Sequence, residues 1–145
     1  MKTQNDQIIQ MLKQNKICQG TLKEDFKFPI KTAAELHATE QLLLLKENYD
    51  NLVSYIKILG GSDAASKVYR ILKWAFTDHV AVDYNFYGKR SNKKVFCQLR
   101  IRDCIVEGVV TSTSGCTEKQ VEDSIKVWLK HAPERVKKND KQIQC

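Results

Sequence analysis

Residues 49–61 read YDNLVSYIKILGG. Their apolar members recur at i, i+3, i+4, i+7 and i+10, which is the spacing of the buried stripe of an amphipathic helix. These members are Tyr49, Leu52, Val53, Ile56 and Leu59. Gly60 and Gly61 follow the stripe and favour the left-handed backbone that ends many helices. We therefore predict a helix over residues 49–59 that packs one face against other helices.

The segments on both sides of this stretch also carry helical signals. Thr32–Glu35 and Thr117–Gln120 have the form of capping boxes, and Ser62 or Asp63 can cap a third helix. The outer side of that third helix is predicted to carry Lys67, Arg70 and Lys73. The predicted helices cover residues 33–46, 49–59, 64–76, 98–110 and 118–131, with a helical turn at 77–82. About five main helices and no strand-rich region predict an all-α fold.

Composition favours a single compact domain. The chain has 145 residues with only 2 Pro and 6 Gly, too few turn residues for a many-stranded β fold. We predict that residues 1–27 form a leader or linker that can contain a short helix. Residues 28–135 are predicted to form the domain. Leu44 is expected on the apolar side of the first helix, and Pro133 is expected to stop the last one. Residues 136–145 then form a polar, basic tail.

Several function classes have no motif in this sequence. The longest apolar run, Leu42–Leu45, is four residues, whereas a membrane span needs about 20. The five scattered cysteines contain no CxxC pair, which predicts reduced thiols in an intracellular compartment and no structural zinc. The three histidines lie far apart, and no nucleophile or phosphate-loop motif is present. We therefore expect that the protein is not an enzyme and binds no metal or cofactor. The alternative is a small enzyme that uses a reactive Cys97 thiol.

The positive charge of the chain is concentrated in one segment. Residues 64–102 hold nine basic and two acidic side chains, a net charge equal to the +7 of the whole chain. Lys and Arg contact phosphates in proteins that bind nucleic acids. The candidate contacts are Lys89, Arg90, Lys93, Lys94, Arg100, Arg102, Lys130, Arg135, Lys137 and Lys138. Tyr84, Phe86 and Tyr87 lie in an expected ordered loop or short hairpin beside them, where they either stack on bases or pack in the core.

Five short blocks of the chain carry a family resemblance. They are FPIKTAAEL (28–36), LGGS (59–62), RILKWAFTD (70–78), YNFYGK (84–89) and WLKHAPER (128–135). In order and spacing they resemble an invertebrate helical domain family, the domain of unknown function four-eight-zero-six, across residues 28–135. That resemblance implies a helical fold, assigns no activity, and points loosely to nuclear or transposon-related proteins. The layout of residues 96–131 is similar to BEN domains, which implies an all-α, BEN-like fold that binds DNA or chromatin proteins.

These observations predict a non-enzymatic, nucleic-acid-associated helical domain that contacts phosphates through its basic loop. The expected partner is DNA or an acidic protein, and the expected location is nuclear. The alternative is a protein-interaction or self-association module, for example a homodimer, whose basic loop is only solvated. The alternatives differ in one structural property, which is whether the basic loop and the basic tail share a face.

Overall fold

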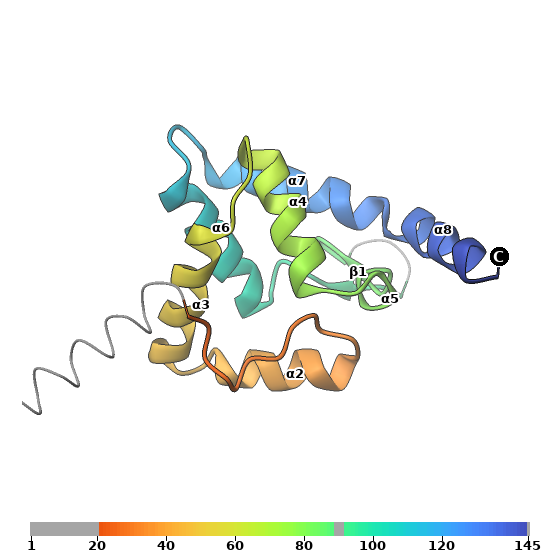
Figure 1. Ribbon diagram of the computed structural model, residues 1–145, viewed down its shortest axis with the longest axis horizontal. Coiled ribbons are helices and arrows are strands. Elements are labelled where there is room, and N and C mark those ends of the chain that lie inside the picture. Colours follow the sequence, from red (N-terminus) through yellow and green to blue (C-terminus); the bar gives the residue numbers. More distant parts are fainter. Residues whose placement is uncertain (1–20, 89–91, 145) are drawn as a thin grey trace, which may run out of the picture.

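The structure, a computed structural model, describes residues 21–88 and 92–144 (Figure 1). Seven helices and one pair of two-residue strands form these described parts. They are α2 (Ala33–Leu42), α3 (Lys46–Ile58), α4 (Ala64–Ala75), α5 (Asp78–Ala81), β1 (Tyr84–Asn85), β2 (Lys94–Val95), α6 (Arg100–Ser112), α7 (Glu118–Lys130) and α8 (Ala132–Gln144). The predicted all-α class is confirmed, but the expected count of about five main helices is too low.

The extra helix arises at the C-terminal end of the described chain. The α7 helix ends at Lys130 with His131 as its C-cap, just before Pro133 as predicted. The segment expected to be a polar tail instead forms α8, which begins at Ala132. Proline is tolerated in the first turn of a helix because the N–H that it lacks has no intrahelical partner there. Pro133 therefore separates two helices and does not end the helical region.

The core lies between two pairs of packed helices. The α3 helix packs against α6, and α4 packs against α7, while α6 also contacts both α7 and α4. Figure 1 shows α2 along one side of this arrangement and α8 extending away from it. The predicted stripe of residues 49–59 points inward at its centre, where Leu52, Val53 and Ile56 are buried. The most buried side chains of the facing helices include Val68, Ile71, Leu72, Ile101, Ile105, Val109, Val121 and Ile125.

One close approach between helices depends on a glycine. A Cβ atom added to Gly108 on α6 would lie 2.9 Å from the Cβ of Ile56 on α3. That distance is shorter than a normal contact between carbon atoms, which is about 3.5–4.0 Å. Gly108 therefore sets how closely the backbones of α3 and α6 can pack.

The connection between α2 and α3 differs from the sequence prediction. The helix expected over residues 33–46 ends at Leu42, and the chain turns before α3 begins at Lys46. Leu44 and Leu45 in this turn are 55% and 64% exposed, so the prediction that Leu44 lies on the apolar side is wrong. Asn48 stabilises the turn, because its side-chain amide donates to the carbonyl oxygen of Leu42 at 2.9 Å.

The end of α3 also differs from the prediction. Among the described glycines a positive φ occurs at Gly88 and Gly115, and α3 ends at Ile58 without a left-handed glycine cap. Gly61 is required for another reason, since a Cβ atom there would lie 2.7 Å from the Cα of Lys67 on α4. Gly61 therefore lets the chain pass close to the backbone of α4.

Lys67 is a further correction, because it does not lie on the outer side of α4. It is 8% exposed, and its ammonium donates to the hydroxyls of Ser112 (2.9 Å) and Thr113 (3.2 Å). A contact of 3.4 Å with the carbonyl oxygen of Ser112 completes the set. A cation is favourable at the C-terminal end of a helix, where carbonyl groups have no intrahelical partners. Lys67 therefore caps α6 from a neighbouring helix.

Candidate nucleic-acid interface

A hollow of about 400 Å³ lies between the β1 segment and the C-terminal half of α7. Its lining residues are Tyr84, Asn85, Phe86, Tyr87, Lys93, Lys126, Leu129 and Lys130, and we call this set the aromatic–lysine pocket. Three of its members are lysines, and none is acidic. Aromatic rings and ammonium groups therefore meet at one place on the described surface.

A short pair of strands builds one wall of this pocket. Strands β1 and β2 are parallel, with Tyr84 opposite Lys94 and Asn85 opposite Val95. The pair is extended by a hydrogen bond of 2.9 Å from the backbone N–H of Cys97 to the carbonyl oxygen of Phe86. The ordered-loop alternative holds for these described residues, whereas the hairpin alternative fails because the strands run parallel. The predicted contacts Lys89 and Arg90 lie outside the described residues.

The three aromatic residues of the wall take two different positions. Tyr84 and Phe86 are buried, and the Tyr84 ring packs edge-to-face on Phe96 at 6.2 Å, which confirms their core interpretation. Tyr87 is 49% exposed and lies perpendicular to the Phe86 ring at 4.9 Å. Alternation along an extended segment accounts for this difference, since Tyr84 and Phe86 are two residues apart and share a face.

Lys126 was not among the predicted site residues, yet it contacts two aromatic rings of the pocket. Its ammonium lies 4.7 Å from the centroid of Tyr87 and 5.1 Å from that of Phe86, within cation–π range. A hydrogen bond with Tyr87 is the main cause that raises the pKa of Lys126, and Asp123 also contributes from 3.7 Å. The side chain therefore keeps its charge well above neutral pH.

Helical spacing could have identified Lys126 from the sequence. Lys126 and the predicted Lys130 are four residues apart on α7 and therefore lie on one face. Lys93 reaches the same pocket from the loop before β2. Lys94 is exposed at the edge of the strand pair, 6.0 Å from the centroid of the Tyr84 ring. The structure thus brings Lys93, Lys126 and Lys130 together, with Lys94 beside Tyr84.

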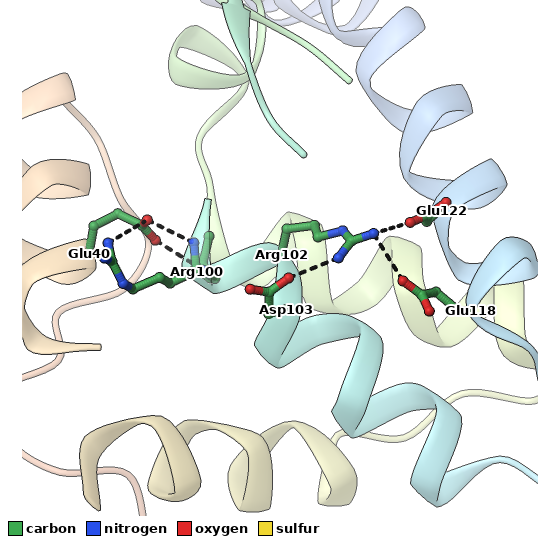
Figure 2. Close-up of polar contacts among 7 residues, drawn as sticks. Glu40, Arg100, Arg102, Asp103, Glu118 and Glu122 are labelled. Carbon is green, nitrogen blue, oxygen red and sulfur yellow. Dashed lines mark hydrogen bonds and ion pairs between the residues drawn. The ribbon is translucent and has the colours of Figure 1, made fainter. Parts of the chain in front are cut away.

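The predicted residues Arg100 and Arg102 lie elsewhere, at the start of α6 (Figure 2). The Arg100 guanidinium is 4.0 Å from the carboxylate of Glu40, a buried acidic residue of α2. The same carboxylate accepts the backbone N–H groups of Arg100 at 2.8 Å and Ile101 at 3.0 Å. Glu40 therefore caps α6, whose own N-cap residue Leu99 offers no side-chain acceptor.

Arg102 is held between α6 and α7 by acidic side chains. Figure 2 shows its guanidinium directed at three carboxylates, those of Asp103, Glu118 and Glu122. The Asp103 contact is 2.8 Å and the Glu118 contact is 3.1 Å. Neither Arg102 nor Arg100 lines the aromatic–lysine pocket. The electrostatic role of Arg102 in this structure is to join the start of α7 to α6.

The remaining predicted residues lie on α8. Arg135 anchors that helix, because its Nε donates to Asp78 at 2.8 Å and its Nη1 donates to the carbonyl oxygen of Trp128 at 2.9 Å. Its guanidinium also stacks over the Trp128 ring at 4.2 Å. Lys137 and Lys138 are exposed. They lie ~8–9 Å along the axis from the start of α8, which begins two residues after Lys130.

Other chemistry in the described part of the chain is sparse. No group of three or more His, Cys, Asp or Glu side chains with metal-binding geometry occurs in residues 21–88 and 92–144. Cys104 is fully buried, and burial is the main cause that raises the pKa of its thiol. Cys97 is half-buried. None of the helices in those residues is both long enough and apolar enough to cross a membrane.

No curated protein and no solved structure matches the chain. A family model described as Domain of unknown function (DUF4806) matches residues 22–108, from before α2 into α6. The matched region ends before α7, so it holds the aromatic wall of the pocket but not Lys126 or Lys130. The predicted resemblance is confirmed over more than half of the chain, and the protein belongs to the DUF4806 family.

Proposed function

We propose that this protein is a non-enzymatic domain that binds nucleic acid at the aromatic–lysine pocket. Lys93, Lys126 and Lys130 would contact phosphates, and Lys94 would extend the contact along the strand edge. The observation that carries the proposal is the convergence of three lysines and no acidic residue on one hollow beside an exposed aromatic ring. Ammonium groups supply the phosphate contacts that account for most sequence-independent affinity for nucleic acids.

The arrangement of the lysines supports an anionic ligand. Lys126 and Lys130 share one face of α7 at i and i+4, a spacing at which like charges destabilise a helix. The Lys126 ammonium lies 3.7 Å from the carboxylate of Asp123 and also interacts with the charge of Glu122. The Asp123 carboxylate is shared, because it also pairs with Lys119 at 3.3 Å. A bound phosphate would offset the repulsion that remains among the pocket lysines. Lys137 and Lys138 are exposed on α8, which begins two residues after Lys130, and they would lengthen the contact.

The proposed interface uses only some of the basic residues that the sequence predicted as phosphate contacts. It does not use Arg102, whose guanidinium contacts three carboxylates, or Arg135, which anchors α8. A nuclear location, a chromatin partner and a kinship with BEN domains belong to the same proposal. They rest on the basic loop and on the layout of residues 96–131.

Fluorescence polarisation with labelled DNA tests the proposal. The test variant combines Lys93→Gln, Lys126→Gln and Lys130→Gln. The matched control combines three exposed lysines outside the pocket, Lys27→Gln, Lys31→Gln and Lys57→Gln, and has the same net charge. We expect the pocket variant to lose at least about tenfold in affinity at low salt. Its slope of log K against log salt should fall by about 2 to 3, near 0.7–0.9 per lost phosphate contact.

The control decides between a site and a general charge effect. If both triple variants lose affinity equally, binding follows net charge and the site is wrong. If the wild-type protein binds neither duplex nor single-stranded DNA at low salt, the function itself is wrong. Circular dichroism of each variant establishes that its helices are intact.

Self-association is the second candidate function. The adjacent Leu44 and Leu45 in the turn between α2 and α3 are both exposed, which is the observation that favours it. If these leucines form a dimer contact, light scattering will give twice the chain mass, and Leu44→Ser with Leu45→Ser will return it to the monomer. The pocket lysine variant should leave that mass unchanged.

A further inference from the structure

One aromatic ring of the pocket is accessible while its neighbours are fixed in the core. Tyr87 is exposed, whereas Phe86 and Tyr84 are buried beneath the same wall. The hollow beside them has a volume of about 400 Å³, within the range of about 300–1,000 Å³ that is typical of small-ligand sites. A purely electrostatic phosphate contact requires neither a hollow nor an aromatic wall. The pocket therefore offers an exposed aromatic surface in addition to its ammonium groups.

We infer that the pocket receives an unpaired base of a single-stranded nucleic acid, which stacks on Tyr87 while the pocket lysines hold the adjoining phosphates. This inference rests on the proposed function and names its substrate class. Aromatic side chains that bind single strands stack on bases of any sequence, because every base has a π-face. Bases in a duplex are already stacked on each other and present only their edges in the grooves.

Contacts around Tyr87 hold its ring in place before any ligand arrives. The backbone N–H of Tyr87 donates to the Asn85 side-chain oxygen at 3.3 Å. The ring meets Phe86 edge-to-face, and the Lys126 ammonium lies 4.7 Å from its centroid. A ring that is already ordered loses little conformational entropy when a base stacks on it. The same contacts place the positive charge of Lys126 over one face of the Tyr87 ring, so a base would stack on the other face.

The lysines that line the pocket would bind the phosphate backbone of the single-stranded nucleic acid. Lys93 comes from the loop side of the pocket, and Lys126 and Lys130 come from the helix side. The base would therefore enter between two groups of cations, and phosphates on either side of it would meet ammonium groups. Leu129, a buried residue of α7, supplies an apolar surface between the two lysines of that helix.

The test compares three DNA probes of equal length on the wild-type protein. They are a 12-nucleotide oligothymidine, a 12-nucleotide abasic strand with the same phosphates, and a 12-base-pair duplex. We expect the oligothymidine to bind about 5- to 150-fold more tightly than the abasic strand, which is the range measured for one stacked base. We also expect it to bind more tightly than the duplex.

Variants of Tyr87 locate the effect. Tyr87→Ala should remove the preference for oligothymidine and leave affinity for the abasic strand within about twofold, because the lysines remain. Tyr87→Phe keeps the ring and should retain the preference. Tyr69→Ala removes an exposed tyrosine of α4 that does not line the pocket, and it should change neither affinity.

The outcomes separate this inference from the proposed function. Equal binding of oligothymidine and abasic strand by the wild-type protein would overturn the base pocket while leaving phosphate binding intact. A preference that survives Tyr87→Ala would overturn the assignment to Tyr87. Absence of binding to all three probes would overturn both the function and the pocket.

Discussion

The carboxylate of Glu40 offers the most direct test of how this fold is held together. Glu40 lies on α2 with a side chain only 10% exposed, and it caps a helix that begins 60 residues later in the chain. Its two oxygens accept the N–H groups of Arg100 and Ile101 (Figure 2). We predict that Glu40→Ala destabilises the whole domain, because the start of α6 has no local side-chain cap to replace it.

The expected magnitude follows from the two hydrogen bonds. The Ile101 N–H is buried, so its loss of an acceptor costs about 1–3 kcal/mol. The Arg100 N–H is partly buried and can form a hydrogen bond with water instead, so the loss of its Glu40 acceptor costs only about 0.5–1.5 kcal/mol. Together they give about 2–4 kcal/mol for Glu40→Ala. Glu40→Gln keeps one carbonyl acceptor and the side-chain volume, so it should cost about half as much.

Urea unfolding followed by circular dichroism measures this difference. With an m-value near 2 kcal/mol/M, the midpoint should fall by about 1–2 M for Glu40→Ala and by roughly half of that for Glu40→Gln. The control is Glu47→Gln, which breaks an exposed ion pair with Lys23 and should change stability by less than about 0.5 kcal/mol. An error of roughly 0.3 M is allowed for the urea midpoint. A Glu40→Ala midpoint that lies within that error of the wild type would refute the role of Glu40 as the cap of α6.

Three further outcomes are expected. Gly108→Ala should lower the free energy of unfolding by about 1–3 kcal/mol in urea titrations, despite the better helix propensity of alanine, because its Cβ meets Ile56. In native alkylation with peptide mapping, Cys104 should stay unmodified while Cys97 reacts, since Cys104 is buried and its thiol pKa is raised; equal rates would contradict this. The pKa of Asp63 is lowered because its carboxylate accepts the N–H of Ser66. The stabilisation of the folded state by this contact is present above the pKa of Asp63 in the unfolded chain, and it is lost as pH falls through the pKa in the folded chain. The stability advantage of the wild type over Asp63→Asn should therefore shrink below about pH 4.

The helices were largely predictable because their signals are local. Both hydrogen bonds of the Thr117–Gln120 capping box form, at 3.0 and 3.2 Å, and α7 begins where the box predicts. The Thr32 hydroxyl likewise caps α2, although Glu35 accepts the N–H of Lys31 and not that of Thr32. The errors occurred where local signals were ambiguous. A run of leucines gave no sign of the turn after Leu42, and Pro133 fits both the end of one helix and the first turn of the next.

The candidate site was only partly predictable from the basic residues. Lys93, Lys94 and Lys130 were selected because of their charge, and the pocket brings Lys93 and Lys130 together. Lys126 was not predicted, although its spacing of four residues from Lys130 places the two lysines on one face of α7. Arg102 was selected on the same criterion of charge, but the structure surrounds it with carboxylates from two helices. Charge in a sequence identifies candidates and does not show which of them already have partners.

The sequence by itself determined the helical class, most helix positions and the segment that holds the excess positive charge. Each of these depends on residues within a few positions of one another, where apolar spacing and capping chemistry act directly on the backbone. The tertiary structure alone decided that Lys67 is buried against α6, that Glu40 caps a distant helix and that Lys126 meets Tyr87. A long cationic side chain is compatible with solvent or with a buried acceptor at the same helical position. Only the packing of segments far apart in the chain selects between those two environments.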